Sequence, residues 1–531
     1  MNSPNLRNRL FLALALFAAA FAAACGGSGS TPAPPPPVGG FSNASLKGQY
    51  AFSMSGFNGP SGQFFGRVGS FIADGNGNIT NGVEDVSIFL TSAGTLAFTP
   101  SQYSVQADGR GVINLTNSTG TLTFSITMLT PTNGLIVETD GIATGSGTFA
   151  MQNTNLFNPA GLSGAYVFDF SGLDSAGSPD SIIGQFVSTG SSSLSSGLLD
   201  ENDGAMLSGA QVFAGGANYA MDATNGATFG KGNITFVANG LTYNYIFYIV
   251  DAGRVHLLEN SLTGSLTVGD AVAQSSVPSS NSTFSGNFVY LASGSGTTGD
   301  ITTIGRFTAD GNGGLNSVVG DTNFTGTIAK IPSGTLSAAT YNIDTTNAGT
   351  GRGTLTFTDS HLGVFQYIFY LGSPSFGVIQ NVSKNSVADG SLAFQTAGPF
   401  TNTSLAGNYG LNFSGISSNS SAQVTGEEDF VGQIVLSGAS SNNVNGAVDF
   451  SEFSSNQGVF PNIVVSGNGL TIGGDGTNSS SSSRNALSLK LNSTPSATLN
   501  FAPYIVNSQT MFVAGTDSNR TISGIISVQA P

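Results

Sequence analysis

The sequence contains no tryptophan, only one cysteine and only two histidines in 531 residues. A single cysteine cannot form a disulfide within the monomer. The histidines, His256 and His361, are far apart and lie in no H-E-x-x-H cluster, so a zinc site has almost no ligand set. Catalysis that needs an imidazole or a thiolate therefore has few residues to use, and we expect no cofactor.

Charge is also scarce, because only 8% of the residues are charged. There are 14 basic residues against 29 acidic ones, which gives a formal net charge of −15. Nucleic-acid binding needs a basic face to neutralise phosphates, and so few scattered cations do not provide one. An acidic surface instead favours solubility of an exported protein.

Helical patterns are lacking as well, apart from the N-terminal apolar run. The chain has 74 glycines, 38 phenylalanines and 13 tyrosines, and its polar residues are mainly Ser, Thr and Asn. Such residues favour strands and turns over helices. Short alternating runs such as 120–126 predict strands with one covered face, whereas the continuously apolar 243–250 and 367–371 predict strands covered on both faces.

The N-terminus has the three-part layout of a secretory signal. Arg7 and Arg9 precede an apolar run over 10–24, and small residues lead into Cys25. The run is too short to span a bilayer comfortably, which takes about 20 residues. Residues 22–25 (AAAC) resemble the lipobox of bacterial lipoproteins, which implies cleavage before Cys25 and lipidation of that residue, for instance with palmitate. An ordinary cleaved signal with an incidental cysteine is the alternative.

The segment that follows the cysteine, GGSGSTPAPPPPVGG, has the composition of a tether. A spacer in this place would hold folded units away from a lipid surface. Gly26 follows the cysteine, where lipoproteins retained in the inner membrane of Gram-negative bacteria resemble one another in carrying Asp. The sequence therefore predicts an exported protein held at the outer membrane or cell surface.

Internal repetition organises the rest of the chain. The phrase that opens each unit, such as LKGQY at 46–50, occurs four times at intervals of about 120 residues. A second phrase follows each opening, Gly-x-Phe in the first three units and Gly-x-Ile in the fourth. The openings lie at 46–50, 162–166, 284–288 and 405–409, the second phrases at Gly69, Gly184, Gly305 and Gly432, and the ends at Gln152, Gln274, Gln395 and Gln529. We predict a signal over 1–25, a tether over 26–43 and β units over 44–153, 160–275, 282–396 and 403–531.

Within a unit, about eight short strands are separated by turn residues, which is typical of an all-β antiparallel barrel or sandwich. The Gly-x-Tyr or Gly-x-Phe opening is similar to the first strand of lipocalin and avidin barrels, where a Trp ring plugs one end. The resemblance implies that Tyr50, Tyr166, Phe288 and Tyr409 hold that place. A Greek-key β-sandwich remains the alternative. The whole chain resembles glycine-rich, multi-repeat bacterial lipoproteins that have no assigned activity.

Two loops offer oxygen ligands at alternate positions, as a Ca²⁺ loop does. Asp74 and Asn76 lie in the first, and Asp310 and Asn312 in the second. The bidentate Glu and flanking helices of an EF-hand are missing. Asp-Gly and Asn-Gly also form tight hairpin turns, and units two and four lack these acids. A turn is therefore the favoured interpretation.

The other candidate sites are carboxylate pairs and glycine-rich loops. Glu427–Asp429 and Asp200–Glu201 could act as glycosidase acids, but they occupy unmatched places in their units, which favours solvated loops. The segment 294–299 fits Gly-x-Gly-x-x-Gly without a following helix, so it predicts a loop.

These observations lead to three hypotheses about function. The first is a non-catalytic binding or structural protein, anchored to a membrane by lipid, whose repeats bind a glycan, a cell surface or a small hydrophobic ligand. The second is a secreted polysaccharide hydrolase. The third is a protein whose repeats only space or coat.

Overall fold

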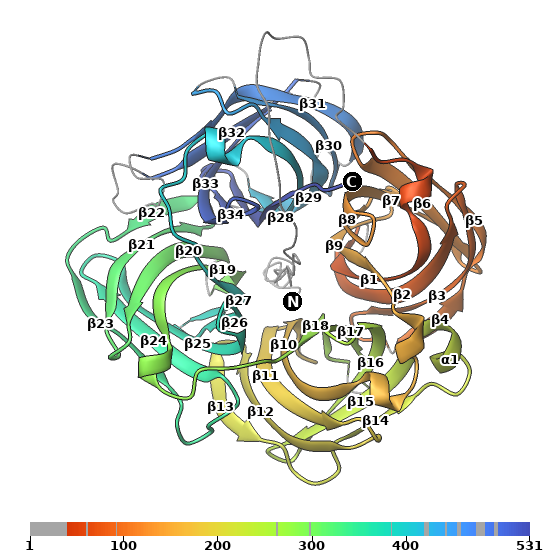
Figure 1. The fold of residues 1–531 in the computed structure, drawn as a ribbon, viewed down its shortest axis with the longest axis horizontal. Coiled ribbons are helices and arrows are strands. Elements are labelled where there is room, and N and C mark those ends of the chain that lie inside the picture. Colours follow the sequence, from red (N-terminus) through yellow and green to blue (C-terminus); the bar gives the residue numbers. More distant parts are fainter. Residues whose placement is uncertain are drawn as a thin grey trace, which may run out of the picture.

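The computed structural model describes residues 40–531 except 60–61, 92, 262–263, 297–298, 384, 419–423, 441–442, 454–457, 474–483 and 493–496. The described chain forms four antiparallel β-barrels arranged in a ring (Figure 1). The predicted signal, Cys25 and most of the tether lie outside the described residues.

The strands follow one another in the same order in every barrel. Barrel 1 consists of β1 (Lys47–Asn58), β2 (Gln63–Asp74), β3 (Asn78–Ile88), β4 (Gly94–Ala97), β5 (Thr99–Val105), β6 (Arg110–Asn117), β7 (Gly120–Thr130), β8 (Asn133–Glu138) and β9 (Ala143–Met151). Barrel 2 consists of β10 (Ser163–Leu173), β11 (Pro179–Thr189), β12 (Leu194–Asp203), β13 (Met206–Val212), β14 (Asn218–Met221), β15 (Lys231–Ala238), β16 (Leu241–Asp251), β17 (Arg254–Glu259) and β18 (Leu266–Ala273).

The second half of the ring repeats this pattern. Barrel 3 consists of β19 (Ser285–Gly296), β20 (Gly299–Asp310), β21 (Leu315–Phe324), β22 (Thr327–Ile331), β23 (Leu336–Ile343), β24 (Arg352–Asp359), β25 (Gly363–Ser373), β26 (Phe376–Asn381) and β27 (Ser386–Phe394). Barrel 4 consists of β28 (Gly407–Ser418), β29 (Val424–Leu436), β30 (Val444–Glu452), β31 (Gly458–Thr471), β32 (Ala486–Leu491), β33 (Ala497–Asn507), β34 (Thr510–Gly515) and β35 (Arg520–Val528).

Each barrel runs up and down, with every strand antiparallel to its neighbours and the last strand paired with the first. The fourth strand is split into two segments in barrels 1 to 3 and is continuous, as β31, in barrel 4. Barrels 1 and 4 close through continuous ladders, whereas isolated bridges such as Phe213↔Ala238 and Gly314↔Thr340 close barrels 2 and 3. The predicted eight-stranded barrel is thus confirmed, and the sandwich alternative is wrong.

The two repeated sequence phrases are partners across the first strand pair. Tyr50 of β1 lies opposite Phe71 of β2, with ring centroids 5.6 Å apart. The same stacking joins Tyr166 to Phe186 at 5.3 Å in barrel 2. Phe288 stacks on Phe307 at 5.5 Å in barrel 3, and Tyr409 lies opposite Ile434 in barrel 4. The repeated aromatic residues therefore form one end of each core, as the lipocalin resemblance implied.

A short 3-10 helix precedes the first strand and covers this end of each barrel. Tyr103 of β5, for example, donates a hydrogen bond from its hydroxyl to the carbonyl oxygen of Leu46, at 2.7 Å. These helices are η2 (Asn43–Ser45), η3 (Thr154–Leu156), η4 (Pro159–Gly161), η5 (Asn281–Thr283) and η6 (Thr403–Leu405). We call this end the plug end and the opposite end the mouth. The one α-helix of the described residues, α1 (Gly226–Phe229), is a single turn.

The barrels are filled with side chains rather than hollow. Each interior contains its own cluster of buried aromatic and aliphatic residues, such as Phe168, Phe236 and Tyr245 in barrel 2. Similar clusters fill barrels 1, 3 and 4. Interiors packed in this way leave no room for a hydrophobic ligand along the barrel axis.

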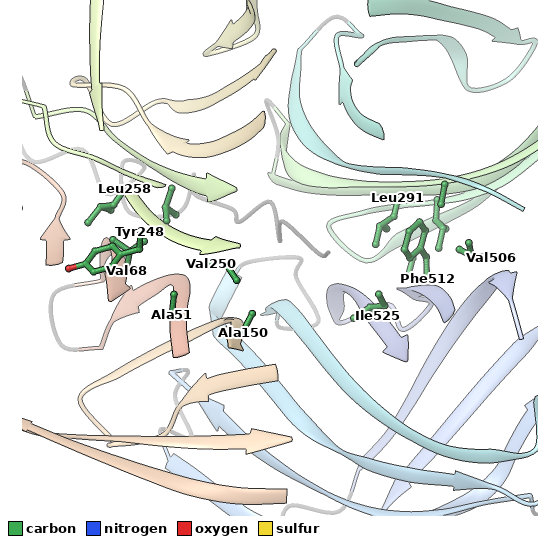
Figure 2. Close-up of a cluster of buried hydrophobic side chains, with 14 of the residues drawn as sticks. Ala51, Val68, Ala150, Tyr248, Val250, Leu258, Leu291, Val506, Phe512 and Ile525 are labelled. Atoms are coloured by element: carbon green, nitrogen blue, oxygen red, sulfur yellow. The ribbon is translucent and has the colours of Figure 1, made fainter. Parts of the chain in front are cut away.

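The outer faces of the strands pack barrel against barrel around the ring. The first two strands of each barrel contact the last strands of the next, and β28 and β29 of barrel 4 contact β7, β8 and β9 of barrel 1. A buried apolar cluster joins the barrels at these contacts; Figure 2 shows Val68 and Leu258 at one junction and Leu291 and Phe512 at another. This packing confirms the prediction that 243–250 and 367–371 are covered on both faces.

Every junction uses equivalent strands, so one rotation relates each barrel to the next. All plug ends therefore lie on one face of the ring, and all mouths on the other (Figure 1). The first described residue, Gly40, lies against Pro531, which places both ends of the described chain together on the plug side. Among the described residues, no helix is long and apolar enough to cross a membrane.

Candidate functional site

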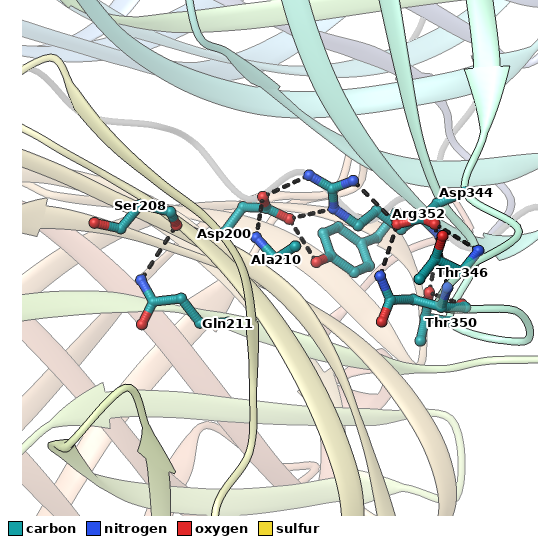
Figure 3. A network of polar contacts seen from close by, with 10 residues as sticks. Asp200, Ser208, Ala210, Gln211, Asp344, Thr346, Thr350 and Arg352 are labelled. Atoms are coloured by element: carbon teal, nitrogen blue, oxygen red, sulfur yellow. Dashed lines mark hydrogen bonds and ion pairs between the residues drawn. The ribbon is translucent and has the colours of Figure 1, made fainter.

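An aspartate of one barrel forms an ion pair with a basic side chain of the next at three of the four junctions. Asp200 in β12 accepts two hydrogen bonds from the guanidinium of Arg352, at 2.7 and 2.8 Å, and a third from the hydroxyl of Tyr370, at 2.6 Å (Figure 3). The same arrangement joins Asp85 to Lys231 and Tyr248, and Asp321 to Arg484 and Tyr504. These polar groups satisfy one another where the barrels exclude water.

The junction between barrels 4 and 1 departs from this pattern. Arg110 donates to the side-chain oxygen of Asn462, at 2.9 Å, and the backbone N–H of Asn462 donates to Asp449. Thr127 stands in β7 where Tyr248 stands in β16, so no tyrosine takes part. This junction is also the one that no peptide segment crosses.

The side chains of the four glutamines that end the repeats donate hydrogen bonds to backbone carbonyl oxygens of the following barrel. Gln152 donates from Nε2 to the carbonyl oxygens of Phe229 and Ile249, at 2.9 and 2.7 Å. Gln274 reaches Thr350 and Leu371, Gln395 reaches Ile505, and Gln529 reaches Asp108 and Met128. The sequence marked these residues as repeat ends but contained no sign that they bind the neighbouring barrel.

The candidate glycosidase acids were expected in solvated loops, and that expectation is wrong. Glu427, Glu428 and Asp429 lie in β29 and are buried, and Asp200 is buried in β12. Asp429 accepts a hydrogen bond from Thr144 of barrel 1, at 2.7 Å. Asp200 and Asp429 bind side chains of neighbouring barrels, which a substrate could not displace without opening the ring, whereas Glu428 pairs with Arg520 of its own barrel.

The two histidines lie in separate barrels and have different surroundings. His256 in β17 is fully buried, and its Nδ1 lies 2.6 Å from Asp270. Burial raises the pKa of Asp270, but Arg254 and His256 outweigh burial and lower that pKa to about 2. His361 follows β24, where its Nδ1 lies 3.1 Å from the hydroxyl of Ser360. The described residues contain no group of three His, Cys, Asp or Glu side chains that could hold a metal ion.

The two candidate calcium loops form hairpin turns held by their own aspartates. Asp74 accepts hydrogen bonds from the backbone N–H groups of Asn76 and Asn78, at 2.6 and 3.0 Å. Asp310 accepts from the N–H groups of Asn312 and Gly314, at 2.7 and 2.9 Å. These carboxylates satisfy the turn backbone, as expected of Asx turns.

The mouths of the barrels contain buried charge on the inward face of the strands. Arg67 lies on the same face of β2 as the core residue Phe65, and its guanidinium lies 2.5 Å from Glu84 and 3.4 Å from Glu138. In barrel 4, Arg520 lies 2.8 Å from Glu428. The arginine in each of these mouths partly neutralises carboxylates that are otherwise shielded from water.

In the mouth of barrel 3, backbone N–H groups rather than an arginine stabilise the carboxylate. Asp359, at the end of β24, accepts hydrogen bonds from the backbone N–H groups of Ser333, Gly334, His361 and Leu362, at 2.7 to 3.1 Å. Although burial opposes them, a hydrogen bond from the hydroxyl of Ser333, at 2.7 Å, and these backbone bonds together hold the pKa of Asp359 well below its usual range. Three of the four mouths thus supply donors for their own acids.

No protein-family model matches the chain, and no curated protein is recognisably similar in sequence. Among solved structures, a Trp176Ala mutant of transferrin binding protein B from Haemophilus parasuis has 10% identity and a TM-score of 0.17, over 74% of this chain and 82% of that chain. Transferrin binding protein B from serogroup B Neisseria meningitidis has 8% identity and a TM-score of 0.17, over 74% and 83%. These similarities are too low to assign a function.

Proposed function

We propose that this chain is a lipid-anchored, exported lipoprotein whose ring of barrels binds a ligand or partner without catalysis. The observation that carries the proposal is the arrangement of the ring faces. Gly40, where the tether meets the first barrel, lies on the plug side against Pro531, and the mouths lie on the opposite side. A lipid on Cys25 would therefore present the mouths away from the membrane.

The burial of the chemically active side chains supports a non-catalytic role. His256 has no hydrogen-bond partner at Nε2 among the described residues, so it has no nucleophile to activate. Asp200, Glu427 and Asp429 are buried at the junctions. A polysaccharide hydrolase, the alternative, needs two carboxyls about 5 to 10 Å apart in a cleft open to substrate. Glycans, cell-surface polymers and small molecules remain the ligand classes to test.

Fractionation of the producing cells tests the anchor. The full-length chain should partition with membranes and carry acyl groups detectable by mass spectrometry at Cys25. A Cys25→Ser variant should lose the acyl groups and move to the soluble fraction. Soluble wild type without acyl groups would overturn the anchor, and hydrolysis of any member of a glycan panel would overturn the non-catalytic role.

A further inference from the structure

The mouth of barrel 2 differs from the other three. Asp180 in β11, Glu201 in β12 and Glu259 in β17 lie on the inward faces of their strands, level with the end of the packed core. Tyr243 donates its hydroxyl hydrogen to Glu201, at 2.9 Å. Glu259 accepts from the hydroxyl of Ser265, at 2.5 Å, and from the backbone N–H of Thr267, at 2.9 Å.

No basic side chain neutralises these acids. None of the ion pairs within the described part of the chain includes Asp180, Glu201 or Glu259. The strand register explains why. Aligned on the paired aromatic residues of the first two strands, the place of Arg67 is taken in barrel 2 by Ile182, which lies directly opposite Glu201. The place of Arg520 is taken by Ser265, just before β18.

Two buried acceptors in this mouth also lack donors. Asp180 is 6% exposed, and its Oδ1 has no hydrogen-bond partner among the described residues. Gln211 is 8% exposed, and its Oε1 likewise lacks a donor there. Each unsatisfied buried acceptor costs about 1 to 3 kcal/mol. One oxygen of Glu138 and one of Glu428 also lack a donor among the described residues, but those two carboxylates have an arginine beside them. A donor with a positive charge would satisfy both the oxygens and the acids.

We propose that the mouth of barrel 2 binds an organic cation, a guanidinium or alkylammonium group, in the place that Arg67 and Arg520 hold in barrels 1 and 4. The proposal rests on the binding role proposed above but not on the lipid anchor. An organic cation fits better than a metal ion, because the described side chains form no metal-ligating group of three. The guanidinium of Arg67 between Glu84 and Glu138 shows the geometry that such a mouth can provide.

The surroundings indicate that the cation has an apolar body. A cleft of about 170 Å³ opens beside the mouth, between barrels 2 and 3. Pro179 and Gly204, which line it, are the chain neighbours of Asp180 and Asp203. Met206 and Leu241, which begin β13 and β16 at the same end of the barrel, are 73% and 52% exposed. The site therefore combines buried negative charge with exposed apolar contacts and suits an amphiphilic amine or an Arg or Lys side chain.

Binding should also release protons. Burial raises the pKa of Asp180, Glu201 and Glu259. Burial, together with the negative charge of Asp174 in the loop between β10 and β11, raises the pKa of Asp203 to about 6. The other titratable groups facing this cluster are Tyr243 and Tyr245 of β16, whose pKa values burial also raises. A cation favours the ionised acids, so affinity should increase from pH 5 to pH 8.

Titration calorimetry of the purified full-length chain tests this inference, with agmatine and an arginine-containing peptide as probes. We expect one saturable site at millimolar concentration or below, with a heat that depends on the buffer because protons are released. Ile182→Arg places a guanidinium opposite Glu201 and should weaken binding about tenfold or more. Because Ile182 is a core residue, circular dichroism must show that the variant is folded. Glu201→Gln should weaken binding similarly. Asp251→Asn, at the plug end of the same barrel, is the matched control and should bind normally.

Binding of either probe that Ile182→Arg abolishes supports the inference, and the probe preferred indicates whether the cation is free or part of a polypeptide. The inference is overturned if neither probe binds wild type, if Ile182→Arg leaves binding unchanged, or if Ca²⁺ binds at this site in preference to both probes. Binding of a glycan elsewhere, with no binding of these probes, would remove this inference and leave the proposed function standing.

Discussion

Gln529 of barrel 4 donates hydrogen bonds from Nε2 to the carbonyl oxygens of Asp108 and Met128 in barrel 1, at 2.9 and 2.8 Å. Next to it, the backbone N–H of Ala530 donates to the carbonyl oxygen of Leu129, at 2.7 Å. These bonds join residues about 400 positions apart and close the ring. At the other junctions the chain itself passes from one barrel to the next, so only here must non-covalent contacts hold the barrels together.

Gln529→Ala should therefore open the ring, whereas Gln274→Ala should not. Each variant loses two equivalent hydrogen bonds to the next barrel and leaves two carbonyl oxygens unsatisfied, at a cost of about 1 to 3 kcal/mol. At the junction of Gln274 the linking peptide keeps the barrels at high effective concentration. Small-angle scattering should show a larger radius of gyration for Gln529→Ala alone. An equal radius for both variants would contradict this account of ring closure.

Asp200→Asn should destabilise the junction between barrels 2 and 3 more than Tyr370→Phe does. The first change removes the carboxylate that accepts two hydrogen bonds from Arg352 and leaves Asp344, at 3.2 Å, as its acidic partner, at a cost of about 3 kcal/mol. The second removes one hydrogen bond and keeps the ion pair, at a cost of about 1 kcal/mol. Urea denaturation followed by tyrosine fluorescence measures both. The double variant Asp200→Leu, Arg352→Met should lose less than Asp200→Asn, because Asp344, which loses Arg352, keeps its hydrogen bonds from the N–H groups of Thr346 and Asn347.

The barrel repeat could be predicted from sequence because the residues of the two repeated phrases are neighbours in space. Tyr50 and Phe71 belong to adjacent strands of one hairpin, so both recur in each unit. Alternation and turn residues are likewise local, and they predicted strands correctly. The choice between barrel and sandwich depends on the pairing of β1 with β9, which are far apart in the chain and leave no local pattern.

The junctions could not be predicted because their partners are distant in sequence and matched only by shape. Asp200 meets Arg352 from the next barrel, and no spacing in the chain relates the two. An acid in a polar stretch therefore looked like a solvated residue. Gln152 was visible as a repeated end, but a repeated residue does not tell which surface it contacts. The missing arginine in the mouth of barrel 2 depends on the strand register that puts Ile182 where barrel 1 has Arg67, and no local sequence pattern indicates that register.

Stability should fall as pH rises from 4 to 7 because of Asp169 and Asp389, and Asp169→Asn should reduce that fall. These carboxyls are buried at the junction of barrels 2 and 3, and burial raises the pKa of Asp169 well above its usual range and that of Asp389 to about 7. Asp270 on β18, paired with Arg254 and His256, and Ser181 on β11 also face the pair. Both raised pKa values mean that the folded state holds protons that the unfolded state has released above about pH 4.

Asp169→Asn reproduces the neutral contact at the junction of barrels 4 and 1, where Asn412 accepts a hydrogen bond from Ser146 at 2.5 Å. Urea midpoints at pH 5 and pH 7.5 should differ less in this variant than in wild type. A wild-type midpoint that is the same at both pH values, or a variant that keeps the whole difference, would contradict the assignment of this pH dependence to Asp169 and Asp389.

The turn at Asp74 should depend on pH rather than on calcium. Hydrogen bonds from Asn78 and Asn76 lower the pKa of Asp74 to about 2. A lowered pKa contributes stability that is fully present above about pH 4 and is lost as pH falls through about 2. Tm should therefore be unchanged by EDTA or millimolar Ca²⁺, and Asp74→Asn should keep much of the turn while weakening the acid dependence between pH 4 and 2. Asp251→Asn serves as an exposed-acid control. A rise in Tm with Ca²⁺ that Asp74→Ala abolishes would instead establish a calcium site in this loop.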